Sequence, residues 1–183
     1  MKKLLLPILL LSQLLVLAQT PQKTFYQNGK PKMQGQIDKN KKATGEWKSY
    51  FENGQLSGVG NYKDGWRTGQ WRTYHENGKP HSIGNYENEL RMGIWKFYHE
   101  NGELEQIGSF NKGVYVNEWK VYHDNGKLFS IGKYDSKGLY VGEWKWYHNN
   151  GQLESIGNFE NSNRKGEGKF YDKEGKLIKK QKY

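Results

Sequence analysis

Histidine recurs at one position of a regular sequence pattern, and histidine is both a common zinc ligand and a common general base. Equivalent positions in successive β-hairpins would lie two strands apart, which is about 9.5 Å at ~4.8 Å per strand. Zinc binds histidine nitrogens at about 2.0–2.1 Å, so two such side chains cannot hold one ion. We therefore predict no metal site and expect half-exposed rings packed on cross-strand neighbours, such as His123 on Leu128. The recurring residues are His75, His99, His123 and His148.

Carboxylates recur beside these histidines, and paired acids can carry acid–base chemistry. Because an active site is a single place, a carboxylate in every unit indicates turn formation and cross-strand pairing instead. Glycine-rich stretches never precede a helical pattern, so no phosphate loop or dinucleotide fingerprint is present. The absence of cysteine excludes a disulfide and a cysteine nucleophile. We predict no enzymatic activity and no cofactor. The carboxylates are Glu52, Glu76, Glu100 and Asp124.

The elements that position these side chains come from an internal repeat. An Asn-Gly dipeptide, with Glu replacing Asn in the last copy, recurs at intervals of 25, 24, 24, 24, 25 and 24 residues. Tryptophan stands seven residues before each glycine except in the end copies, where Gln22 and Gly168 replace it. Atypical end copies are typical of capping repeats. The turn glycines are Gly29, Gly54, Gly78, Gly102, Gly126, Gly151 and Gly175.

Each copy is predicted to form a β-hairpin, because Asn-Gly between alternating segments favours a two-residue type I′ turn. With Asn53 and Gly54 as the turn, Trp47 lies opposite Gly60. A ring lying over the bare backbone of the opposite glycine would shield it, so we expect both residue types to be structural. The pairs are Trp47–Gly60, Trp71–Gly84, Trp95–Gly108, Trp119–Gly132 and Trp144–Gly157.

Strand alternation sorts the side chains onto two faces. One face carries Trp47, Gly60 and Tyr62 and is expected to be the apolar spine, whereas the other carries Lys48 and Tyr50 and is expected to be more exposed. Tyrosine is enriched in protein-binding surfaces and also stacks on sugar rings, so the second face is either a binding surface or simply the other side of the sheet. Its candidate residues are Tyr50, Tyr74, Tyr98, Tyr122, Tyr147, Lys96, Lys120 and Lys145.

The segments Gly45–Gly54 and Gly142–Gly151 show the pattern Gly-x-Trp-x-x-Tyr-x-x-Asn-Gly. This pattern resembles the MORN repeat and is similar to the bacterial variant found in YwqK-type antitoxin components. The resemblance implies an elongated, twisted antiparallel sheet, association with membranes or protein assemblies, and no shared catalytic residue. The antitoxin likeness implies toxin neutralisation, which an exported chain could carry out only outside the cytoplasm, as an immunity protein.

The first eighteen residues have the pattern of a secretory signal peptide. Lys2 and Lys3 precede the apolar stretch from Leu4 to Leu17, and Ala18 ends the segment. A spanning helix needs ~20 apolar residues, so cleavage after Ala18 is favoured over an uncleaved anchor. We predict a short lead at residues 19–24, a repeat array at residues 25–183, and a location in the periplasm, at the cell surface or outside the cell.

The formal net charge of +10 is concentrated at the two ends of the array. Residues 19–48 carry seven lysines against two acids, residues 164–183 carry eight basic residues against three acids, and residues 49–163 carry twelve against fourteen. Lysine on the free edges of a sheet opposes edge-to-edge association. We therefore do not expect nucleic acid as a partner, and we expect self-association to be disfavoured.

The sequence as a whole predicts an all-β, single-layer antiparallel meander of seven consecutive hairpins. Repeat arrays of this kind build extended binding surfaces, so we expect an exported scaffold that binds a protein partner. Binding of a glycan or the cell wall through the aromatic columns is the first alternative, and association with an anionic membrane surface is the second.

Overall fold

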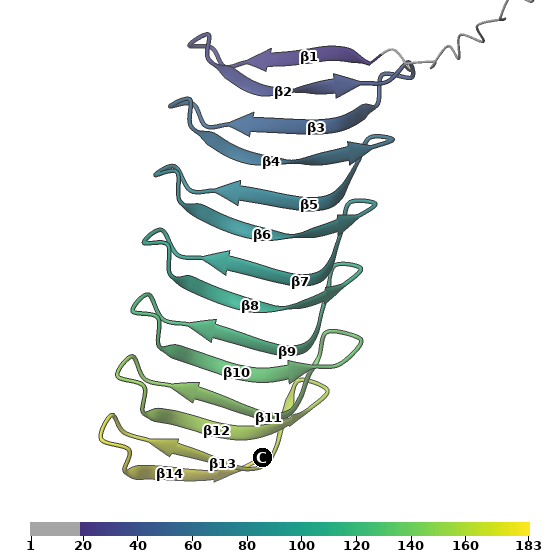
Figure 1. The fold of residues 1–183 in the computed structure, drawn as a ribbon. Coiled ribbons are helices and arrows are strands. Elements are labelled where there is room, and N and C mark those ends of the chain that lie inside the picture. The colour runs from purple at the N-terminus through teal and green to yellow at the C-terminus, as the bar shows by residue number, and fades with distance from the viewer. Residues whose placement is uncertain (1–18) are drawn as a thin grey trace, which may run out of the picture.

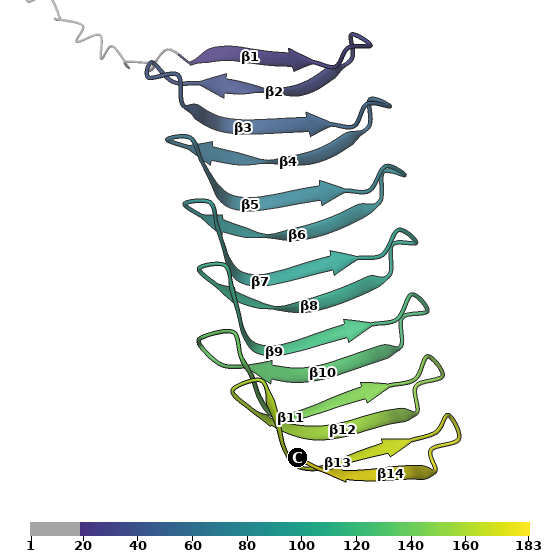
Figure 2. The same cartoon turned by 180° about the vertical axis from the view of Figure 1, so that it is seen from behind.

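The computed structural model describes residues 19–183, which form one open sheet whose antiparallel strands follow each other in chain order (Figure 1). The two opposite views show a single layer (Figure 2). The predicted meander of hairpins is confirmed, whereas the predicted signal peptide lies outside the described residues. Residues 19–183 contain no helix with the length and apolar character that a membrane span requires.

The strands have similar lengths throughout the described chain. They are β1 (Thr20–Phe25), β2 (Pro31–Ile37), β3 (Ala43–Tyr50), β4 (Leu56–Lys63), β5 (Trp66–Tyr74), β6 (Pro80–Glu87), β7 (Leu90–Tyr98), β8 (Leu104–Asn111), β9 (Val114–Tyr122), β10 (Leu128–Tyr134), β11 (Tyr140–Tyr147), β12 (Leu153–Glu160), β13 (Asn163–Tyr171) and β14 (Leu177–Lys182). Because β1 begins at Thr20 and pairs with β2, most of residues 19–24, expected as a lead, belong to the first hairpin.

The Asn-Gly turns are three-residue loops, so the predicted two-residue type I′ turn is wrong. The N–H of Phe51 donates to the carbonyl of Gln55 at 2.8 Å, and the N–H of Gly54 donates to the carbonyl of Phe51 at 2.9 Å. In this loop Gly54 has a positive φ, of 95°, and Asn53 does not. Instead, Oδ1 of Asn53 accepts the N–H of Gln55 at 2.8 Å. A type I turn closed by a left-handed glycine satisfies these contacts.

A one-residue bulge compensates for the longer loop and restores the predicted register. Tyr50 pairs with Leu56 and Ser49 with Gly58, so the partner strand carries an extra residue between these pairs. Beyond the bulge, Trp47 lies opposite Gly60 as expected. Two-residue turns with positive φ at both positions do occur, but at the other edge of the sheet, where they join successive hairpins, as at Asp64 and Gly65.

Each tryptophan ring covers a glycine of the preceding hairpin, whereas the sequence predicted that it would cover the glycine opposite. A Cβ atom built on Gly108 would lie 2.1 Å from Cδ2 of Trp119, although Trp119 pairs with Gly132. The indole N–H also donates to the carbonyl of Ser109 at 3.1 Å. The ring contacts that correct the predicted pairs are Trp47–Gly35, Trp71–Gly60, Trp95–Gly84, Trp119–Gly108 and Trp144–Gly132.

A bulge between hairpins turns the indole in this direction. Ile107 pairs with Lys120 and Ser109 with Val116, so three residues of β9 lie opposite the single Gly108. The first of these three residues, Asn117, has a φ of 63°. The equivalent position in most other hairpins is the glycine of the Gly-x-Trp pattern, such as Gly93 with a φ of 66°. That glycine therefore forms a bulge inside a continuous strand, because a left-handed conformation suits glycine.

The tryptophans alternate with tyrosine or phenylalanine in a continuous spine on one face, which we call the inner face. Neighbouring centroids lie 5.0–6.4 Å apart with edge-on geometry, which suits the ring quadrupoles. Trp95 and Trp119 are each only 2% exposed. The spine is Trp47, Tyr62, Trp71, Tyr86, Trp95, Phe110, Trp119, Tyr134, Trp144 and Phe159.

Side-chain hydrogen bonds join successive hairpins along the Asn-Gly edge. Nε2 of His99 donates to the carbonyl of Tyr122 at 3.0 Å, because a carbonyl can only accept. His75, His123 and His148 make the same bond to the next hairpin. The ring of His123 also lies edge-on to Phe129, with the ring centroids 5.1 Å apart.

Asparagine at the turns makes a second bond between hairpins. Nδ2 of Asn101 donates to the carbonyl of Asp124 at 2.6 Å, while Oδ1 of the same side chain accepts the N–H of Glu103 at 2.9 Å. One amide therefore both closes its own loop and holds the loop of the next hairpin. This double use explains why asparagine recurs before the turn glycine.

Both halves of the tryptophan–glycine contact are missing at the ends of the sheet. Gln22 on β1 and Gly168 on β13 stand where inner hairpins carry tryptophan, and Gln181 on β14 pairs with Gly168 where inner hairpins carry glycine. The ring of Tyr183 covers Gly168 instead. The backbone N–H of Tyr183 donates to the carbonyl of Gly166 at 2.9 Å. These replacements are typical of capping repeats.

We predict that Gly108→Ala destabilises the array by about 1–3 kcal/mol, because the new methyl group must displace the ring of Trp119 from a packed spine. Gly157→Ala is the matched control. At Gly157 the nearest atom to a new Cβ is a guanidinium nitrogen of Arg164 at an ordinary 3.5 Å, so we expect a change within about 0.5 kcal/mol. Urea unfolding followed by tryptophan fluorescence measures both. Equal losses would contradict the assigned ring contact.

We predict that His99→Phe lowers the free energy of unfolding by about 0.5–1.5 kcal/mol, because phenylalanine keeps the ring but leaves the carbonyl of Tyr122 without its donor. His81→Phe is the control. The ring of His81 contacts Thr73 and His75 within one hairpin, so we expect a smaller loss. The same urea titration compares them, and a larger loss for the control would refute the bridging role of His99.

Candidate interaction surface

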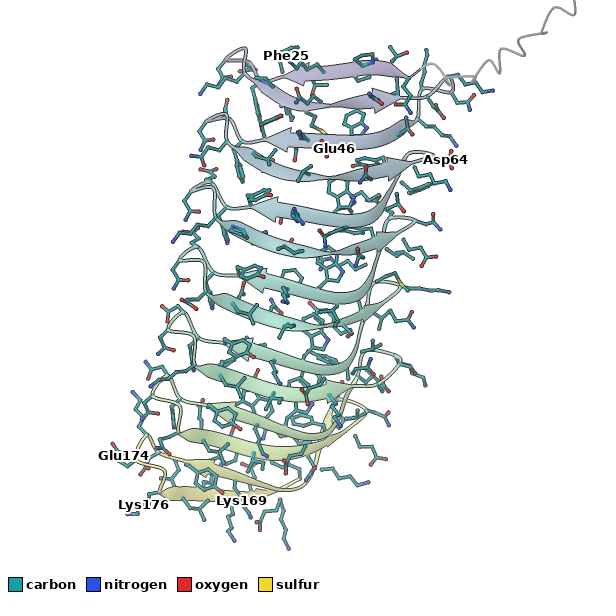
Figure 3. All side chains as sticks on the ribbon, in the orientation of Figure 1. Phe25, Glu46, Asp64, Lys169, Glu174 and Lys176 are labelled. Carbon is teal, nitrogen blue, oxygen red and sulfur yellow. The ribbon has the colours of Figure 1, made fainter. Side chains whose placement is uncertain are left out.

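The face opposite the tryptophans, here called the outer face, carries a row of directly paired side chains with one residue from every described strand. From Lys48 to Lys169 cations alternate with valine or isoleucine. Lys169, labelled in Figure 3, lies near the C-terminal end of this outer-face row. The row is Lys23, Gln34, Lys48, Val59, Arg72, Ile83, Lys96, Ile107, Lys120, Ile131, Lys145, Ile156, Lys169 and Lys180.

The regular hairpins give the row a fixed spacing. Adjacent strands lie ~4.8 Å apart, so cations of successive hairpins are about 9.6 Å apart. The aliphatic side chains between them are partly buried, and long basic side chains can lay their methylene stems along such apolar neighbours. The result is a row of charged groups that runs across the strands, with partly buried valine and isoleucine side chains between them.

Most of the central cations have a polar neighbour two residues earlier on the same strand. Glu118 lies 3.3 Å from Lys120, and Gln70 accepts a hydrogen bond from Arg72 at 2.8 Å. Glu46 raises the pKa of Lys48 by hydrogen bonding and charge, and Glu143 raises the pKa of Lys145 in the same way. These pairs are solvent-exposed, so they stabilise little and can exchange for another anion.

The β7 strand breaks this pattern at the centre of the face. Ile94 stands where every later hairpin and the two before it carry glutamate or glutamine, and it is 62% exposed. Together with Ile107, Glu118 and Lys120 it lines a shallow depression on the outer face. Ile94 is not among the site residues expected from the sequence, although its place in the Glu-x-Lys column of the repeat could have identified it.

The candidate tyrosines lie on the same face as the lysines because they follow the cation by two residues along each strand. Their rings are half-buried, and the hydroxyl of Tyr50 accepts a hydrogen bond from Gln34 at 2.7 Å. They are more exposed than the tryptophans of the central hairpins, which are nearly covered. The tyrosine column and the outer-face row therefore form one continuous surface.

The inner face is covered by residues that were not expected from the sequence. They pair with the tyrosines and phenylalanines of the spine, as Arg91 pairs with Tyr86 and Tyr140 with Tyr134. The guanidinium of Arg91 lies 4.8 Å from the ring centroid of Trp95, and Tyr140 stacks on Trp144 at 4.1 Å. In the later hairpins these residues create a half-exposed group, with Tyr134 lying 5.3 Å from Tyr115 and 5.0 Å from Tyr140. Burial and the neighbouring Tyr140 raise the pKa of Tyr134, so its hydroxyl stays neutral.

Hydrogen bonding and burial shift the pKa values of three further side chains. Backbone N–H groups lower the pKa of Asp135, and Lys165 lowers that of Glu160, so both carboxylates stay ionised at neutral pH. Burial lowers the pKa of His81. Within the same residues, no group of three or more His, Asp or Glu side chains is placed to hold a metal ion.

Comparison with known proteins gives the family. A family model described as MORN repeat variant matches seven segments, residues 19–39, 43–64, 67–88, 93–112, 115–136, 140–161 and 164–183. No curated protein matches the chain. Among solved structures, a crystal structure of an S. aureus TarM mutant in complex with Fondaparinux, alpha-GlcNAc-glycerol and UDP shares 14% identity over 53% of this chain and 19% of that one, with a TM-score of 0.35.

The seven matched segments follow the seven hairpins and cover most of the described chain. MORN repeats are generally non-catalytic modules that commonly serve as protein-binding scaffolds. The chain belongs to the MORN repeat variant family.

Proposed function

We propose that the array is a non-enzymatic scaffold that binds a protein partner across its outer face. The observation that carries this proposal is the outer-face row, in which cations alternate with aliphatic side chains from Lys48 to Lys169. The half-buried tyrosines beside it add the residue type that protein interfaces favour. Such a surface offers charge for orientation and apolar area for affinity.

The proposal includes export. The signal-peptide pattern of residues 1–18 supports a scaffold in the periplasm, at the cell surface or outside the cell. An immunity role, in which the partner is a toxin met outside the cytoplasm, is a narrower form of the same proposal. A mature N-terminus at Gln19, found by sequencing protein from the native host, would support cleavage.

A second candidate function is glycan binding on the inner face. It is favoured by the half-exposed group of Tyr115, Tyr134 and Tyr140, in which the ring centroid of Tyr134 lies 5.3 Å from that of Tyr115 and 5.0 Å from that of Tyr140. Tyrosine presents an apolar ring with a polar tip, which suits a sugar ring with its hydroxyls. Retention on insoluble cell wall, abolished by Tyr115→Ala but not by outer-face substitutions, would favour this function.

We predict that Lys96→Glu with Lys120→Glu weakens binding to the captured partner by tenfold or more, because reversed charges at an interface cost several kcal/mol. The matched control is Lys112→Glu with Lys137→Glu, which makes the same charge change in turns at the sheet edge. The partner is captured by cross-linking in the native envelope, and its affinity for each purified variant is then measured. Equal weakening by both pairs would contradict an outer-face site.

A further inference from the structure

We propose that the outer-face row receives an acidic, proline-rich segment of the partner in the polyproline II conformation. This inference rests on the proposed function, because it names the chemistry of the protein partner and the way it lies on the sheet. It is carried by three features of the outer face: its charge, its spacing and the tyrosine column beside it.

The charge of the central outer face favours an acidic ligand. Arg72, Lys96 and Lys120 follow each other in the row. Of the residues two positions before them, only Glu118 is charged, since the other two are Gln70 and Ile94. The centre of the face therefore carries more positive than negative side chains, and Ile94 lies there as an exposed apolar contact.

The spacing of the row selects the conformation of that ligand. Five cations from Lys48 to Lys145 span four hairpin intervals, or about 38 Å. Twelve residues of polyproline II span about 37 Å, and every third residue returns to the same side. An α-helix needs seven residues per interval and about 42 Å for the same four. In an extended β-strand every third residue points to the opposite face, so half of the acids would point away.

The tyrosine column lies beside the row and could contact such a ligand along its whole length. Tyr98 and Tyr122 lie two residues beyond Lys96 and Lys120 on the same strands, about 7 Å away. Proline-rich segments dock in grooves lined by aromatic side chains, where their stiff backbone loses little entropy. The carbonyl groups of polyproline II make no internal hydrogen bonds, so tyrosine hydroxyls can donate to them. Acids would then face the cations while proline rings contact tyrosine and isoleucine.

Synthetic peptides test the inference without knowledge of the partner. The test peptide has five Glu-Pro-Pro units. One control has the same composition with its glutamates grouped at one end, a second replaces glutamate by glutamine, and a third is an alanine-rich helix with five glutamates at every seventh residue. Binding to residues 19–183 is measured by fluorescence anisotropy at low and at physiological salt, because surface charge effects are strongest at low salt.

We expect the test peptide to bind about tenfold or more tightly than each control. We also expect Lys96→Gln with Lys120→Gln to weaken that binding, and Lys112→Gln with Lys137→Gln to leave it within twofold. Equal binding of the grouped peptide would show that net charge alone acts, and tighter binding of the helical peptide would show that the ligand is a helix. Either result, or no binding of any peptide, overturns the inference, while the captured partner and its Lys96 and Lys120 variants still decide the proposed function.

Discussion

The contact between an indole ring and the bare backbone of the preceding hairpin is the interaction on which this sheet depends. A two-stranded hairpin is marginally stable by itself in water, and each of the five inner hairpins has a tryptophan that reaches back to the hairpin before it. The ring of Trp119 leaves no room for a side chain on Gly108, and its N–H holds the next carbonyl. Tryptophan therefore acts between units, which makes stability a sum of contacts between nearest neighbours, as in other repeat arrays.

This contact also determines the chemistry of the opposite face. Because the bulge and the ring fix the position of each hairpin against the one before it, residues such as Lys96 and Ile107 come into direct register along the sheet. A single-layer sheet needs one apolar face to be stable. The inner face supplies most of this apolar surface, since Trp95 and Trp119 are nearly covered. The outer face is then free to carry charge, and its composition can serve binding.

The sequence predicts the hairpins, their number and the Cα register beyond the bulge, where the pairing of Trp47 with Gly60 needs only counting, but not the register beside the turn, where Tyr50 pairs with Leu56. It does not predict which glycine each ring covers. Pairing places two residues opposite each other, whereas the direction of a side chain depends on the bulge, and a glycine such as Gly93 looks like a loop residue in sequence. The bridging role of His99 was missed for the same reason, because its acceptor belongs to the next hairpin. For the candidate surface, the tyrosines and lysines could be identified from the sequence. The exposed Ile94 stands out only when the residues two positions before each cation are compared from hairpin to hairpin.

The geometry favours a long ligand over a compact one. Each added hairpin extends the outer-face row by about 9.6 Å and adds a cation, an aliphatic side chain and a tyrosine, while no hairpin adds depth. A ligand that contacts several equivalent positions gains from each of them only if its own repeat matches this interval. A mismatch of 1 Å per interval would grow along the sheet until contacts fail. Recognition by such an array therefore depends on the period of the ligand as much as on its charge, and a stiff polymer with a fixed rise meets that condition better than a flexible one.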